Sequence, residues 1–123
     1  MKLVTNNAVA NVASPPRSNE VLRIEAELRS AVRNARRALG GEHVNTALCL
    51  IQLADFLHHE QRDAEAEAIY RHAADVYETL GLAHELLLAI ALRGLALTLC
   101  AQSRHAEAEA ITAKSTALIR EFQ

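Results

Sequence analysis

Residues 64–69 read Ala-Glu-Ala-Glu-Ala-Ile, and residues 106–111 repeat the same six residues in the same order. Shifting the sequence by 42 residues superposes the two hexapeptides and also aligns apolar positions that precede them. The further aligned pairs are Ala47/Ala89, Leu50/Leu92, Leu53/Leu95, Ala54/Ala96, Leu57/Leu99 and Arg62/Arg104. Self-similarity at a period of this length indicates an array of repeated structural units.

Apolar residues in the repeated blocks recur at steps of three and four, the spacing of an α-helix that buries one face. Glycines mark two boundaries, because Gly40-Gly41 and Gly81 follow apolar stretches at positions where helices commonly end. Ser18 or Asn19 can cap the first helix. The sequence therefore predicts an all-α fold without strands, with two helices per repeat and five helices over about residues 18–39, 44–60, 63–80, 85–101 and 105–122.

The composition fits one small helical domain. Of the 123 residues, 50% are hydrophobic but only 3% are aromatic, so the core must be built from Leu, Ala, Ile and Val. Residues 1–17 are polar, rich in asparagine and end in Pro15-Pro16-Arg17 without a helical period. We therefore predict a flexible N-terminal arm over residues 1–17 and a helical domain over residues 18–123.

Charge, cysteine usage and hydropathy restrict the partners and the cellular compartment that the protein can have. The net charge of -2 argues against nucleic acid and acidic membranes as partners. Cys49 and Cys100 lie in apolar stretches, which predicts buried thiols in a reducing compartment. The apolar run 86–101 is too short for a membrane span and carries Arg93 in its middle. Because the N-terminus also lacks the pattern of a secretory signal, we predict a cytoplasmic protein.

The histidines and glutamates that could serve in catalysis or metal binding are better explained by structural roles. His58 and His59 are adjacent, so on a helix they point about 100° apart and do not share a metal. The glutamates of the hexapeptides fall in the first turn of a predicted helix, where the helix dipole stabilises carboxylates. The sequence holds no phosphate-binding glycine loop, nucleophile elbow or Cys/His arrangement. We predict no enzyme activity, no cofactor and no metal site.

Two patterns in the first block carry a resemblance to a known family. The first helix reads Leu50-x-x-Leu53-Ala54-x-x-Leu57, and the second, after a turn at Gln61-Arg62, reads Ala66-x-x-x-Tyr70-x-x-Ala73. This arrangement resembles the tetratricopeptide repeat, and the stretch over residues 39–47 resembles the loop of the 42-residue type found in kinesin light chains. The resemblance covers about residues 20–121. It implies an α-solenoid of antiparallel helical hairpins, with about two and a half repeats.

The resemblance also implies a function, which is to bind a peptide or helix of another protein without catalysis. In this family the first helix of each repeat lines a concave, partner-binding face. The residues at those positions are Leu48, Ile51, Gln52, Asp55 and His59 in the first block and Ile90, Arg93, Gly94 and Leu97 in the second. Kinesin-light-chain-like repeats usually have asparagines where Ile51-Gln52 and Arg93-Gly94 stand here. We therefore expect a mostly apolar groove with one acid and one base.

Apolar residues in excess of what two repeats can cover indicate a second interaction. The helix predicted over residues 85–101 is apolar all round, which is typical of a helix covered on every side. We expect Leu88, Ile90 and Leu97 to need a partner, and the last helix to expose Leu118, Ile119 and Phe122. A homodimer would cover this surface. The alternative function is therefore a small structural or regulatory homodimeric subunit or chaperone of an enzyme or secretion complex.

The first predicted helix carries a basic patch, which consists of Arg29, Arg33, Arg36 and Arg37. Acidic residues of the same helix offset the patch, and no aromatic residues are interleaved for base stacking. A solvated outer face and a site for phosphates or an acidic peptide both fit this pattern.

Overall fold

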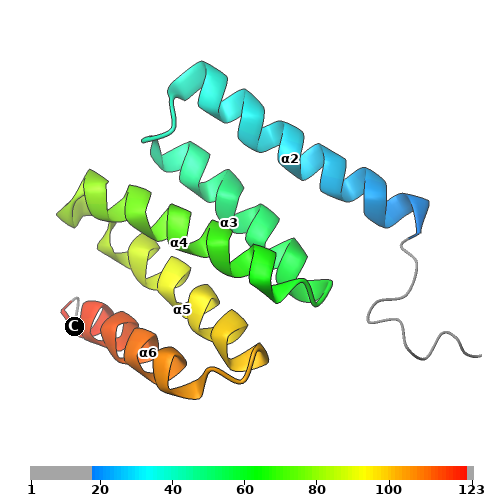
Figure 1. Cartoon of the computed structure of the whole chain (residues 1–123). Coiled ribbons are helices and arrows are strands. Elements are labelled where there is room, and N and C mark those ends of the chain that lie inside the picture. The colour runs from blue at the N-terminus through cyan, green and yellow to red at the C-terminus, as the bar shows by residue number, and fades with distance from the viewer. Residues whose placement is uncertain (1–17, 122–123) are drawn as a thin grey trace, which may run out of the picture.

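The computed structural model describes residues 18–121, which contain no strand. The chain forms α2 (Asn19–Leu39), α3 (Val44–His59), α4 (Asp63–Leu80), a 3-10 turn η1 (Leu82–His84), α5 (Glu85–Ala101) and α6 (His105–Arg120). Each α-helix packs against the helices before and after it in the sequence (Figure 1). The predicted all-α stack of hairpins is confirmed. The predicted arm and Phe122 lie outside the described residues.

Glycine ends α2 and α4, as the sequence predicts. Gly40 and Gly81 have φ angles of 90° and 94°, which most residues with a side chain avoid. The amide of Gly40 donates to the carbonyl of Arg36 at 2.9 Å and so closes the last turn of α2. At the other end of α2, the Ser18 hydroxyl accepts a hydrogen bond from the amide of Val21 at 3.1 Å.

The helices α3 and α5 end in a common turn that lacks glycine. Gln61 and Ser103 have φ angles of 63° and 62°, in the left-handed region that disfavours most side chains. The amides of the next residues, Arg62 and Arg104, donate back to the last turn of the preceding helix at 2.8 and 2.9 Å. The two turns therefore place an arginine at equivalent positions of the two repeats.

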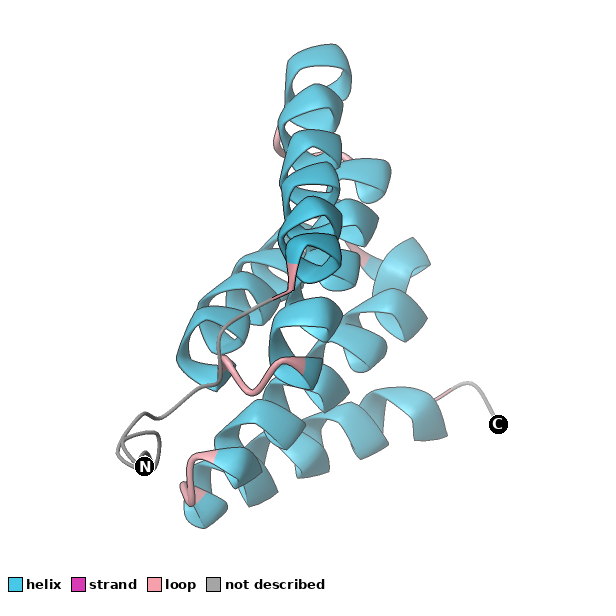
Figure 2. Ribbon diagram, turned by 90° about the vertical axis from the view of Figure 1, so that its right-hand side faces the viewer, coloured by secondary structure: helices cyan, strands magenta, loops and turns pink. Residues whose placement is uncertain are grey.

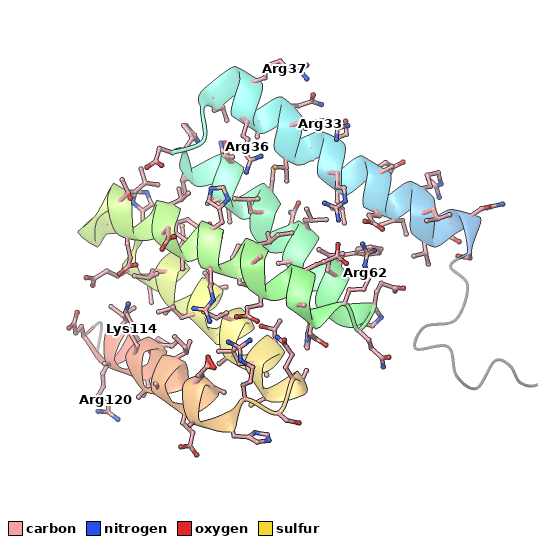
Figure 3. The ribbon with its side chains drawn as sticks, viewed as in Figure 1. Arg33, Arg36, Arg37, Arg62, Lys114 and Arg120 are labelled. Carbon is pink, nitrogen blue, oxygen red and sulfur yellow. The ribbon has the colours of Figure 1, made fainter. Side chains whose placement is uncertain are left out.

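These arginines tie each hairpin to the helix before it. The Arg62 guanidinium contacts the Glu25 carboxylate of α2 at 2.6 Å (Figure 3 labels Arg62). At the position 42 residues later, Arg104 contacts the Glu67 carboxylate of α4 at 2.7 Å. Each arginine also contacts the glutamate three positions after it at 2.7 Å. Glu67 of the repeated hexapeptide therefore joins the two repeats.

Equivalent positions of the two sequence repeats are buried in the core. Leu57 of α3 and Leu99 of α5 occupy equivalent positions, and each is 0% exposed. Ser115 of α6 is equivalent to the buried Ala73 and is itself buried. Its hydroxyl donates to the carbonyl of Ala89 in α5 at 2.9 Å, so the extra polar group is satisfied. The second hairpin therefore accommodates this substitution, although α6 buries only Ala108 and Ser115 where α4 buries six residues.

Two predictions about α5 are wrong. Cys100 is exposed, and Leu88 is only 6% exposed because it belongs to the main buried cluster. Both errors have the same cause, since a helix that is apolar all round has no period from which its buried face can be assigned. Cys49 of α3 is half-buried. No helix within residues 18–121 combines the length and the apolar character needed to cross a membrane.

Candidate functional site

A groove opens between α3 and α5, the first helices of the two repeats, with part of α4 at its side. Its volume is about 710 Å³, within the range of about 300–1,000 Å³ that is common for ligand sites. Figure 2 places α2 at one end of the array and α6 at the other, so the groove belongs to the middle of the array. The residues that line it are Asp55, His58, His59, Gln61, Asp63, Tyr70, Ile90, Arg93, Gly94, Leu97 and Ala101.

The structure brings most of the predicted partner-binding residues together in this groove. Six of them line it, which are Asp55, His59, Ile90, Arg93, Gly94 and Leu97. The other three, Leu48, Ile51 and Gln52, lie nearer the start of α3 and outside the groove. Leu48 is 39% exposed and Gln52 is also exposed, so both extend the accessible surface of α3 beyond the groove.

The apolar part of the groove comes from α5. Ile90 and Leu97 are 54% and 53% exposed, more than Leu86 at 48% and Leu22 at 47%. They are seven residues apart and therefore lie on the same side of the helix. Arg93 stands between them along α5 and is exposed. The groove thus offers one apolar side chain on each side of a positive charge.

A hydrogen bond from Tyr70 crosses from α4 to the floor of the groove. Its hydroxyl donates to the carboxylate of Asp55 in α3. Burial raises the pKa of Tyr70, and the hydrogen bond to Asp55 raises this pKa further, so the hydroxyl keeps its proton. The sequence analysis used Tyr70 only as part of the repeat pattern, because nothing in the spacing of the two residues indicated this contact.

Gly94 makes room for the Tyr70 ring. A Cβ atom added at Gly94 would overlap the ring of Tyr70, a residue that is only 2% exposed. The equivalent residues one repeat earlier are Leu28 and Gln52, a smaller side chain and a larger one. The departure from the asparagine usual in kinesin-light-chain-like repeats therefore has a steric cause at Gly94.

The charged side chains of the groove differ in whether they have a partner within the chain. The His58 Nδ1 atom lies 2.5 Å from the Asp63 carboxylate, across the turn between α3 and α4. The two residues are five positions apart and lie on either side of the turn, so no helical spacing indicated this contact. Among the described residues, Arg93 has no ion-pair partner. The groove therefore presents a free positive charge, while Asp55 and Asp63 are bonded within the chain.

The residues predicted for self-association are divided by the structure. Ile119 of α6 is 40% exposed, whereas Leu118 is half-buried and packs against the core. Leu88 is buried, as stated above, and therefore contributes no accessible surface. Within residues 18–121, α6 packs along α5, and Lys114 reaches across to the Glu78 carboxylate of α4 at 3.3 Å. One side of α6 is therefore open to a further contact.

The side chains of the groove are suited to non-covalent contacts with a ligand. Residues 18–121 contain no group of three or more His, Cys, Asp and Glu side chains placed to hold a metal ion. The two histidines of the groove lie beside carboxylates and a guanidinium, with no nucleophilic serine or cysteine in its lining. The groove therefore offers contact area, one free charge and two bonded carboxylates.

Comparison with known proteins gave one match. A family model described as tetratricopeptide repeat matches residues 50–121, more than half of the chain. Comparison with curated proteins and with solved structures found no match. The matched range starts within α3 and includes the whole of α4, α5 and α6, so it contains every residue that lines the groove. The match does not test the kinesin-light-chain-like type, which stays a prediction.

Proposed function

Since this chain belongs to the tetratricopeptide repeat family, whose repeats generally mediate interactions between proteins, we propose that it is a non-catalytic adaptor whose groove between α3 and α5 binds a segment of another protein. The observation that carries the proposal is the exposure of Ile90 and Leu97, at 54% and 53%, on the side of α5 that lines the groove. Apolar side chains that cluster in a concave site gain free energy when a partner removes them from water.

The free charge in the groove indicates the chemistry of the partner. Arg93 lacks a carboxylate within the described residues, whereas Tyr70 and His58 engage the two aspartates. A guanidinium forms its strongest hydrogen bonds with a carboxylate. The partner segment therefore carries an apolar side chain against Ile90 or Leu97 and a carboxylate against Arg93.

We expect Leu97→Glu and Ile90→Glu each to weaken binding of such a segment by about tenfold or more, because the new carboxylate must be desolvated against apolar partner atoms. Both positions are exposed, so the variants should fold. Peptides are first selected on the wild-type chain from a random display library. Their affinities for the variants are then measured by fluorescence anisotropy.

Leu22→Glu is the matched control for these variants. Leu22 is 47% exposed on α2 and lies outside the groove, so this substitution adds the same charge at a comparable site without touching the proposed interface. Its affinity for the selected peptides should stay within about twofold of wild type. Equal affinity of all four proteins for the selected peptides would show that the groove is not the binding site.

A second candidate function is a small structural or regulatory subunit that works as a homodimer. It is favoured by the open side of α6, where Ile119 is 40% exposed, and by the packing of α6 within the described residues, which is against α5 with one ion pair to α4. We expect the wild-type chain to show twice the mass of one chain by light scattering at high concentration. Ile119→Glu should then shift the mass toward that of a monomer, whereas Leu22→Glu should not. A monomer at every concentration would remove this candidate.

A further inference from the structure

A second groove lies between α2 and α4, above the middle of α3. Its volume is about 340 Å³, near the lower end of ligand sites, so it fits a few side chains rather than a whole helix. Val32 and Leu53 are buried in its floor beside the half-buried Ile69, while Arg33, Arg36 and His72 stand at its rim. It shares no lining residue with the groove between α3 and α5.

The positive charge at this rim is not neutralised by the described part of the chain. Residues 30–41 contain three arginines and no acidic residue. Arg33 and Arg37 form no ion pair within residues 18–121, and Arg36 contacts only the His72 ring, at 3.5 Å. Figure 3 shows these three arginines along the C-terminal half of α2.

Stabilisation of the α2 helix dipole explains only part of this cluster. Arg36 and Arg37 lie in the last turn of α2, where positive charge is favourable. Arg33 lies about one turn earlier and lines the groove, so its position gains less from the dipole. By contrast, Arg62 and Arg104, which hold the array together, each have two carboxylate partners. The arginines of the second groove are thus available to a ligand.

We propose that the second groove binds an acidic segment of another protein, with one apolar side chain entering between α2 and α4 and neighbouring carboxylates pairing with Arg33 and Arg36. The two arginines are three positions apart, which places them about 4.5 Å apart along the helix axis. Carboxylates on adjacent turns or alternate residues of a peptide can reach both. Arginine binds carboxylates through paired hydrogen bonds, which gives the contact a defined geometry.

The features of the groove favour a protein segment over other polyanions. No Phe, Tyr or Trp side chain lines it, so it lacks the large rings on which successive nucleic-acid bases stack. The apolar floor instead requires an apolar group from the ligand. Residues 1–17 of the chain contain no Asp or Glu, so they do not supply the carboxylates.

The test uses the full chain labelled with ¹⁵N and titrated with a short peptide of alternating Glu and Leu. Saturable shifts of amide signals are expected at residues 29–37 and 68–72, which form the two walls of the groove. The same peptide with Gln in place of Glu should bind at least about tenfold more weakly, because the charge-assisted contacts are lost.

Two pairs of variants have matched changes of charge. Ala68→Glu adds a carboxylate at an exposed position of the groove, and Ala110→Glu makes the same change at the equivalent exposed position of α6. One double variant combines Arg33→Glu and Arg36→Glu in the groove. Its control combines Arg23→Glu and Arg120→Glu, at exposed sites outside the groove. The groove variants should lose about tenfold or more in affinity and the controls less than about twofold.

Several results would overturn the proposal. They are the absence of binding by the wild-type chain at about millimolar peptide, shifts that fall on residues 90–97 instead, and equal losses in groove and control variants. Tighter binding of a single-stranded oligonucleotide to the same residues would assign the groove to nucleic acid. Loss of self-association in the Arg33→Glu, Arg36→Glu variant without any peptide would assign it to a second copy of the chain.

Discussion

Leu57→Ala should lower the free energy of unfolding by about 2–5 kcal/mol, which is a large part of the total stability of about 5–15 kcal/mol expected for a domain of this kind. Leu57 is 0% exposed in the middle of the array, where α3 packs between α2 and α4. Truncation removes apolar burial and leaves a cavity that neighbouring helices can fill only in part. The melting temperature should fall by roughly 10 °C or more, measured by circular dichroism.

Leu48→Ala is the control on the same helix. It removes the same atoms from a side chain that is 39% exposed, so the loss should stay below about 1 kcal/mol. Leu99→Ala should resemble Leu57→Ala, because Leu99 is the equivalent residue and is also 0% exposed. Similar melting temperatures for Leu57→Ala and Leu48→Ala would contradict the packing described for α3.

Glu25→Gln should reduce the free energy of unfolding by about 2 kcal/mol near neutral pH, because hydrogen bonds between charged groups are lost. The side chains of Glu25 and Arg62 are 13% and 14% exposed, so water screens the pair much less than a surface ion pair. Hydrogen bonding by Arg62, assisted by Arg29, lowers the pKa of Glu25 from 4.5 to about 2.

This lowered pKa gives the effect a defined dependence on pH. Because the pKa is lower in the folded chain than in the unfolded chain, the Glu25 carboxylate stabilises the fold fully above about pH 5. That stabilisation is lost as the pH falls from 4.5 toward 2. The difference in unfolding free energy between wild type and Glu25→Gln, from urea titrations at several pH values, should therefore shrink over this range.

Glu27→Gln provides the comparison for this pH dependence. The Glu27 side chain lies two residues away on α2, is 64% exposed and pairs with the exposed Arg23 at 3.3 Å. Its substitution should cost less than about 0.5 kcal/mol at any pH. A gap between wild type and Glu25→Gln that stays constant down to pH about 2 would mean that the carboxylate does not stabilise the fold through its charge.

The helices were predictable because their signals are local. The bounds predicted for residues 63–80 and 85–101 agree with α4 and α5, and α3 differs by one residue at its end. Apolar steps of three and four, together with the glycines at 40 and 81, specify where these helices start and stop. The groove could also be predicted in large part, because the family resemblance assigned positions on the first helices one by one.

The contacts between helices were not predictable, because they depend on packing that no local pattern encodes. Tyr70 donates to Asp55 over 15 residues, and Arg62 binds Glu25 over 37. Arg62 served only as a marker of the 42-residue alignment until the fold placed it against α2. The prediction of which side of α5 is buried failed for a different reason, since the apolar residues of this helix occur on every side. The exposed Cys100 and buried Leu88 follow from that missing asymmetry.

The fit between Tyr70 and Gly94 also limits how the units of this protein can be rearranged. The two hairpins share a backbone plan, yet α3 carries Gln52 where α5 carries Gly94. A copy of α3 placed after α4 would bring that glutamine against the Tyr70 ring, in space that is already filled. The hairpins are therefore not interchangeable parts. Because Tyr70 fits against a glycine that α3 lacks, duplication or shuffling of one unit would require a compensating change in its neighbour.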